Sequence, residues 1–200
     1  MAVTPNYSWP VPVNTDLVKD GADAIKDLGD AIDATVFGLP SGALALVKTQ
    51  TIGTAVTSVT VTGAFSTTYD AYKIIVTGGA SNVGDGVAML QLSPTTTGYK
   101  WNMIYSGYGS GSVLSATTNN DSHFRYVACF DTNGLRMNLD ILNPFLNKQT
   151  SFINMFADST IAGTGSGMLT NTTSYTDFIL SIQGGSTMTG GTIRVYGYQN

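Results

Sequence analysis

The sequence is poor in the side chains that most enzymes use. Its 200 residues contain no glutamate, one histidine (His123) and one cysteine (Cys129). Acid–base and nucleophilic catalysis need such groups within hydrogen-bond reach of one another. His123 and Cys129 stand on one expected strand, where six residues at about 3.3 Å each separate them by about 20 Å. We therefore expect no catalytic residues and no enzymatic activity.

The same scarcity argues against metals and cofactors. A zinc site with one histidine and one cysteine would need several carboxylates, and the aspartates do not cluster in the sequence. Asp131-Thr-Asn-Gly134 offers oxygen ligands, but it lacks the acidic series of a calcium loop and predicts a hairpin turn. We expect no metal within one chain and no cofactor, and an ion on an oligomer axis stays open.

Charge is also scarce. Charged residues make up 11% of the chain, and the net charge is −4 without a basic stripe, which argues against nucleic acid as a partner. No run approaches the about 18 apolar residues of a membrane-spanning helix, so we expect no membrane insertion. The first residues lack the charged and apolar regions of a signal peptide, and we expect synthesis in the cytoplasm. Little charge is typical of an assembly, where association hides surface.

What the chain does contain changes along its length. Residues 1–15 hold three prolines with Tyr7 and Trp9 between them, and prolines at this density favour extended backbone. We expect an extended arm that attaches to another protein through Tyr7, Trp9, Pro10 and Pro12, because exposed aromatics are preferred interface anchors. A disordered arm is the alternative.

A helix is expected over residues 16–37. The heptad Lys19-Asp-Gly-Ala-Asp-Ala-Ile25 is followed by Lys26-Asp-Leu-Gly-Asp-Ala-Ile32, and this repeat puts apolar residues on one narrow seam. The seam residues that we expect to drive oligomerisation are Val18, Ile25, Leu28 and Ile32. We predict a trimeric coiled-coil stalk, about 30 Å long at about 1.5 Å per residue. The alternative is an amphipathic helix that packs on its own domain. Residues 38–43 predict a hinge.

From residue 44 the period changes to two, as in strands with one buried face. The expected strands are Leu46–Ile52, Val56–Val61, Tyr72–Thr77, Val87–Leu92, Lys100–Tyr105, Phe124–Phe130, Leu135–Ile141, Ser151–Ala157, Asp177–Gln183 and Thr192–Tyr198. Turn residues separate them, including Asn119-Asn120-Asp121. Many short strands without helices between them predict a mainly β fold, an antiparallel β-sandwich head over residues 44–200 that resembles a jelly roll.

Two glycine-rich stretches interrupt these strands. Gly107–Gly111 and Gly163–Gly167 lack the Lys-Ser/Thr of a phosphate-binding loop, and we expect flexible loops. Aromatic rings near such loops suit the recognition of a sugar or a protein. We therefore assign receptor contact to Tyr99, Trp101, Tyr105 and Tyr108, with burial of these rings in the core as the equal alternative.

Several stretches resemble tailed-bacteriophage minor tail and tail-fibre proteins. They include Tyr7-Ser-Trp-Pro-Val-Pro-Val-Asn-Thr-Asp16, Asp20-Gly-Ala-Asp-Ala-Ile25, Phe65-Ser-Thr-Thr-Tyr-Asp-Ala-Tyr-Lys-Ile-Ile75 and the ending Gly191-Thr-Ile-Arg-Val-Tyr-Gly-Tyr198. The resemblance implies a virion structural protein, commonly a homotrimer, which attaches by its N-terminus and points a β head outward. It carries no catalytic residues to transfer.

These observations together predict a trimeric tail fibre or spike subunit of a phage virion. Its expected partners are itself, another virion protein bound by the N-terminal arm, and a host-surface glycan or protein. We expect the tail rather than the capsid as its place. The alternative is a capsid decoration or head-fibre protein with a purely structural role. A third hypothesis, an enzyme that acts on surface polysaccharide, would need acids from neighbouring subunits.

Overall fold

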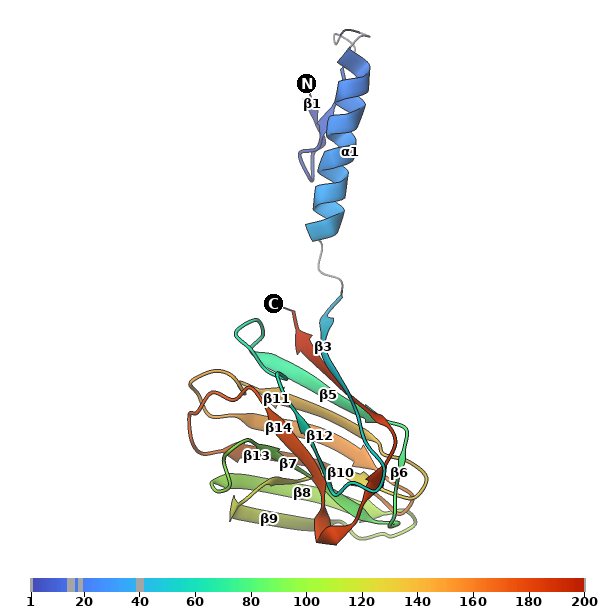
Figure 1. Ribbon diagram of the computed structural model, residues 1–200, viewed down its shortest axis with the longest axis vertical. Coiled ribbons are helices and arrows are strands. Elements are labelled where there is room, and N and C mark those ends of the chain that lie inside the picture. Colours follow the sequence, from blue (N-terminus) through green and yellow to red (C-terminus); the bar gives the residue numbers. More distant parts are fainter. Residues whose placement is uncertain (1, 14–16, 18–19, 39–41, 200) are drawn as a thin grey trace. The chain divides into compact units, whose positions relative to one another are not determined.

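The computed structural model describes residues 2–13, 17, 20–38 and 42–199 (Figure 1). The chain divides into two compact units, an N-terminal unit (Met1–Gly42) and a β domain (Ala43–Asn200). Within the described ranges, no helix has both the length and the apolar character that crossing a membrane requires. Val18 and residues 39–41 of the expected hinge lie outside the described residues.

The N-terminal unit is a hairpin beside a helix. Strands β1 (Ala2–Val3) and β2 (Pro10–Val11) pair antiparallel, and the backbone N–H of Thr4 donates to the Trp9 carbonyl at 2.9 Å. The indole Nε1 of Trp9 donates to Thr35 Oγ1 at 2.9 Å, which ties the hairpin to the helix. In its described part, the segment expected as an extended arm therefore folds back, because a turn after Thr4 lets the two strands pair.

Helix α1 runs over Gly21–Gly38, against 16–37 expected from the heptads. One face lies toward the hairpin and buries Ala24, with Leu28 and Thr35 half-buried beside it. This face of the helix therefore packs against the hairpin of the same unit. Ile25 lies on a different face of α1 from Ala24 and is 67% exposed.

The β domain holds the remaining strands (Figure 1). In chain order they are β3 (Leu44–Thr51), β4 (Ser58–Val61), β5 (Ala71–Thr77), β6 (Ala80–Ser81), β7 (Gly86–Leu92), β8 (Tyr99–Gly107), β9 (Leu114–Asp121), β10 (Phe124–Phe130), β11 (Met137–Leu142), β12 (Ser151–Ala157), β13 (Ile161–Leu169), β14 (Phe178–Ile182), β15 (Met188–Thr189) and β16 (Thr192–Tyr198). The prediction of a mainly β, antiparallel fold with one helix is confirmed for the part of the chain that the structure describes.

Two large sheets carry the domain. The larger has the order β3-β16-β5-β11-β12-β13-β8-β9, and the smaller has the order β10-β7-β14-β4. Strands β15 and β6 form a separate two-stranded ribbon. Every pairing between these strands is antiparallel.

The sheets face each other across one apolar core. Strands such as β5 bury alternate residues, here Tyr72, Ile74 and Val76, as the period of two predicts. Phe124 of the smaller sheet meets Phe152 of the larger with ring centroids 4.7 Å apart. Asn154 Nδ2 also crosses between the sheets and donates to the Val127 carbonyl at 2.7 Å.

Two strands contradict the sequence-based expectations. Residues 163–167 lie within β13 and are not a flexible loop. A Cβ at Gly163 would lie 2.4 Å from the Ile104 carbonyl oxygen and 2.7 Å from the Phe156 ring, so glycine makes room for the side chains of the neighbouring strands. Asn119–Asp121, expected as a turn, belongs to β9, an edge strand made mostly of polar residues.

The turn at Asp131–Gly134 is confirmed, but it does not form a hairpin. Asp131 and Gly134 exchange two backbone hydrogen bonds of 3.3 Å. The flanking strands β10 and β11 belong to different sheets, so the turn carries the chain from the smaller sheet to the larger.

Candidate functional site

The residues expected to dock on another virion protein differ in exposure. The rings of Tyr7 and Trp9 stack with centroids 5.1 Å apart, and Tyr7 is largely exposed. Trp9 and Pro10 are half-buried, whereas Pro12 is exposed. The hairpin therefore leaves Tyr7 and Pro12 exposed, and Trp9 holds the hairpin on α1.

Helix α1 carries a second apolar face, which we call the helix stripe: Ile25, Gly29, Ile32 and Val36. Steps of four, three and four residues place these side chains on one line of the helix surface. Ile25 and Val36 are exposed and Ile32 is half-buried. Of the residues expected to drive oligomerisation, Ile25 and Ile32 lie on this stripe, and Leu28 lies between it and the hairpin.

Two of the four aromatic residues assigned to receptor contact lie in the core. Tyr99 is fully buried, and its hydroxyl accepts a hydrogen bond from the Leu92 N–H at 2.8 Å. Burial raises the pKa of this phenol. Trp101 is also buried, Tyr105 is half-buried, and Tyr108 is exposed beyond the end of β8. The assignment to receptor contact is therefore corrected for Tyr99 and Trp101, because inward positions of β8 point to the core.

Trp101 belongs to a polar network at the edge of the larger sheet. Its Nε1 donates to Asp121 Oδ2 at 3.0 Å, and Arg125 Nε donates to the same oxygen at 2.6 Å. Burial alone would raise the pKa of Asp121, but the hydrogen bonds from Arg125 and Trp101 outweigh it and lower the pKa to about 2. The network joins β8 and β9 of the larger sheet to β10 of the smaller one.

The outer face of the larger sheet carries exposed apolar side chains on the strands β12, β13 and β8. We call Ile104, Ile153, Met155 and Met168 the outer patch; Met155 is 76% exposed. Cross-strand partners of the patch are hydroxyl residues, with Ile153 opposite Ser166 and Met155 opposite Thr164. Two shallow hollows of about 560 and 600 Å³ run along this face. Such a surface suits contact with another molecule.

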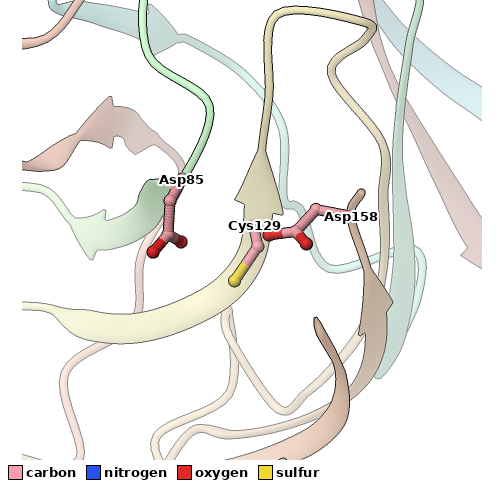
Figure 2. Close-up of side chains that lie close together, drawn as sticks. All are labelled: Asp85, Cys129 and Asp158. Atoms are coloured by element: carbon pink, nitrogen blue, oxygen red, sulfur yellow. The ribbon is translucent and has the colours of Figure 1, made fainter. Parts of the chain in front are cut away.

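A different cluster gathers groups that lie far apart in the sequence. Asp85 precedes β7, Cys129 lies on β10 and Asp158 follows β12. Figure 2 shows the Cys129 side chain between the two carboxylates, and the potential ligand atoms of the three residues all lie within 4.8 Å of one another. Cys129 is 1% exposed and Asp158 is 7% exposed, whereas Asp85 is exposed.

The two carboxylate oxygens of Asp158 differ in their hydrogen bonding. Oδ1 accepts hydrogen bonds from the backbone N–H of Thr160 and of Ile161 and from the Thr160 hydroxyl, at 2.6–2.8 Å. Oδ2 is buried without a hydrogen-bond partner. The turn after β12 thus fixes the carboxylate through one oxygen and leaves the other unsatisfied.

The environment of the Cys129 thiol favours its protonated form. Burial, and then the charges of Asp158 and Asp85, raise its pKa to about 12, so the thiol stays protonated near neutral pH. His123, the other group considered for catalysis, contacts the Ser122 hydroxyl through Nδ1 at 2.7 Å. Burial and the charge of Arg125 lower the pKa of this histidine.

Asp131 supports the cluster from the neighbouring turn. Its Oδ2 accepts a hydrogen bond from the Ser159 N–H at 3.1 Å and forms an ion pair with Arg136 at 3.2 Å. Burial alone would raise the pKa of Asp131, but the Asn133 N–H, Arg136 and the Ser159 N–H lower it. A hollow of about 230 Å³, lined by Asp131, Asn133, Arg136, Ala157, Asp158 and Ser159, opens beside the cluster.

The cluster could not be found from the sequence because its members come from three separate segments. No spacing in the chain links Asp85, Cys129 and Asp158, and only the pairing of β7 with β10 and the packing of the sheets bring them together. Comparison with known proteins gives no further guide to the site: no protein family, no curated protein and no solved structure matches the chain.

Proposed function

We propose that the protein is a structural subunit of a tailed-phage particle, a trimeric tail fibre or spike. In this proposal the N-terminal unit attaches the subunit and assembles it with its copies, and the β domain faces the host surface. The observation that supports this most is the helix stripe beside the helix face that the hairpin covers. Ile32 of the stripe is half-buried, and its other three residues are exposed.

The helix stripe favours association of like chains. It follows a sequence repeat of seven residues, the period at which helices pack against copies of themselves. Full burial of one isoleucine stabilises an assembly by about 1.5–3 kcal/mol, so Ile25 and Ile32 from three chains would offset much of the cost of association. A trimeric coiled coil formed by α1 is the arrangement that we propose.

We also propose that the β domain is a jelly roll with two inserted hairpins. Its strands pair in a nested order, β3 with β16, β4 with β14, β5 with β11 and β7 with β10, as in a long antiparallel ribbon wrapped on itself. The strands β8–β9 and β12–β13 extend one edge of the larger sheet. Jelly rolls recur in viral capsid and lectin domains, and this analogy supports a virion role.

Host contact is assigned to exposed features of the β domain. The outer patch offers Ile104, Ile153, Met155 and Met168 between hydroxyl side chains, and Tyr108 offers an exposed ring. Apolar and aromatic groups among hydroxyls suit a glycan or a protein surface. Three copies on one particle would turn weak single contacts into avidity.

The oligomeric state of the full chain tests the assembly. Light scattering of purified protein should give a trimer, and Ile25→Asp combined with Ile32→Asp should give monomers whose near-ultraviolet circular dichroism from the β domain is unchanged. Ala34→Asp is the matched control, because Ala34 is exposed on the side of α1 away from the stripe. A wild-type monomer, or a trimer that survives both stripe substitutions, contradicts the proposed stalk.

Immunogold labelling of intact particles tests the location. Gold at the tail tip or tail fibres supports the tail fibre. Labelling spread over the head would instead favour the alternative, a capsid decoration or head-fibre protein, which also needs an attachment unit. Absence of the protein from purified particles contradicts both.

A further inference from the structure

The cluster at Cys129 has the composition and burial of a metal site. We propose that Asp85, Cys129 and Asp158 bind one divalent transition-metal ion, Zn²⁺ by preference, which cross-links the two sheets of the β domain. This site is independent of the proposed virion role, and neither depends on the other.

The unsatisfied oxygen of Asp158 points to a bound cation. Asp158 is 7% exposed, and its Oδ2 has no donor although Oδ1 has three. A buried carboxylate oxygen without a partner loses its hydration at a cost in free energy, and a bound ion compensates for that loss. Asp85 and Cys129 would supply the further ligands, since their potential ligand atoms lie within 4.8 Å of a carboxylate oxygen of Asp158.

The donor set selects the class of metal. A thiolate with two carboxylates suits Zn²⁺ and its substitutes Co²⁺ and Cd²⁺, whereas Ca²⁺ and Mg²⁺ take oxygen ligands alone. Three protein ligands leave the fourth tetrahedral position to water. On binding, the Cys129 thiol loses its proton to solvent and the sulfur becomes a ligand of the ion.

The geometry needs only a small adjustment. Ligand atoms around tetrahedral zinc lie about 3.5 Å apart, given bonds of about 2.3 Å to sulfur and about 2.0 Å to oxygen. The present separations are no longer than 4.8 Å, so any contraction that the site needs is small. Asp85 can supply that movement, because it is exposed on a loop between Gly84 and Gly86, whereas Cys129 and Asp158 are held in strand and turn.

A metal at this position would link the two sheets of the β domain. Cys129 lies on β10 of the smaller sheet, and Asp158 lies in the turn between β12 and β13 of the larger one. The ion would therefore fasten the β12–β13 hairpin to the opposite sheet. Because binding requires the folded arrangement, the metal should raise the free energy of unfolding in proportion to its occupancy.

Titration of the tag-free full chain with Co²⁺ tests the site. We expect one ion per chain, an intense near-ultraviolet thiolate-to-cobalt charge-transfer band, and its loss when Zn²⁺ is added in competition. Cys129→Ser should abolish the band. Asp85→Asn should weaken Co²⁺ binding by more than the roughly 10–100-fold that loss of an outer-shell partner costs.

The controls separate loss of a ligand from loss of the fold. Asp85 and Asp70 are both exposed aspartates, so Asp70→Asn is the matched control and should bind Co²⁺ like the wild type. Zn²⁺ should raise the thermal unfolding midpoint of the wild type and of Asp70→Asn, and raise it less in Asp85→Asn. Absence of the thiolate band in the wild type, or equal Co²⁺ affinity in Asp85→Asn and Asp70→Asn, would overturn the proposal.

Discussion

The N-terminal unit and the β domain differ most in how much apolar surface each one buries. Among the described residues, Ala24 is the one buried apolar side chain of the N-terminal unit, and the rest of the buried core belongs to the β domain. The N-terminal unit instead exposes Ile25, Val36 and Phe37. Burial of apolar surface is the main stabilising term in folding, and an isolated 18-residue helix is marginal in water. The β domain can thus hold itself together, whereas the N-terminal unit has little buried apolar surface to stabilise it.

The largest expected effect concerns the packing of the β domain. A Cβ at Gly167 would lie 2.4 Å from the Lys100 carbonyl oxygen and 2.5 Å from the Phe152 ring. We expect Gly167→Ala to lower the free energy of unfolding by about 3 kcal/mol, because a strand must shift to admit the methyl group. Denaturant unfolding followed by intrinsic fluorescence measures the loss.

Gly111→Ala is the matched control, because Gly111 lies in an exposed loop with no heavy atom near its Cβ position. Its stability should stay within about 0.5 kcal/mol of the wild type. Equal stability of the two variants would mean that β13 does not pack closely against its neighbours.

A smaller effect is expected from the network that joins the sheets. Since folding lowers the pKa of Asp121 from 3.8 to about 2, its carboxylate stabilises the fold above its ordinary pKa, and this contribution disappears as the pH falls toward 2. We expect Asp121→Asn to cost about 2 kcal/mol near neutral pH, and the difference from wild type to shrink in acid. Urea unfolding at a series of pH values measures it.

The comparison between variants at each pH isolates this carboxylate from the others, which titrate in both proteins. A difference that stays constant down to about pH 2 would assign the effect to packing and not to the charge of Asp121.

The smallest effect is expected in the N-terminal unit. Trp9→Phe keeps the ring stacked near Tyr7 but removes the donor to Thr35, which lies 2.9 Å away. We expect about 1 kcal/mol less protection for the amides of α1, as for one half-buried hydrogen bond. Hydrogen exchange with mass spectrometry measures this locally. Slower or faster exchange throughout the β domain would show that the stabilities of the two units are coupled. It would contradict the inference from burial that the β domain is stable by itself.

Several of the strands expected from the sequence have alternating burial. Leu139 and Ile141 of β11 alternate with polar neighbours, and the structure buries both. Strand β13 was not predicted because the inward positions in its middle part are glycines, which carry no apolar signal. Strand β9 was not predicted because it is an edge strand rich in Ser, Thr and Asn, which are also common in turns.

The candidate sites follow the same division. The sequence pattern indicated Ile25 and Ile32 of the helix stripe, because their repeat is local in the chain, but it grouped them with Leu28 and not with Gly29 and Val36. The burial of Tyr99 and Trp101 could not be read from neighbouring residues, because it depends on which face of β8 lies toward the core. Hydrogen-bonding rings suit the core as well as the surface, so residue type could not decide.

The sequence by itself determined the change from a helical period to a strand period, the mainly β fold, and the apolar repeat on α1. These depend on neighbours within a few residues, which fix which side chains share a face. Only the tertiary structure decided that Gly163 and Gly167 of β13 lie against aromatic rings, and that Asp85, Cys129 and Asp158 meet. Both result from strand pairing and sheet packing between segments far apart in the chain, and no local pattern encodes such contacts.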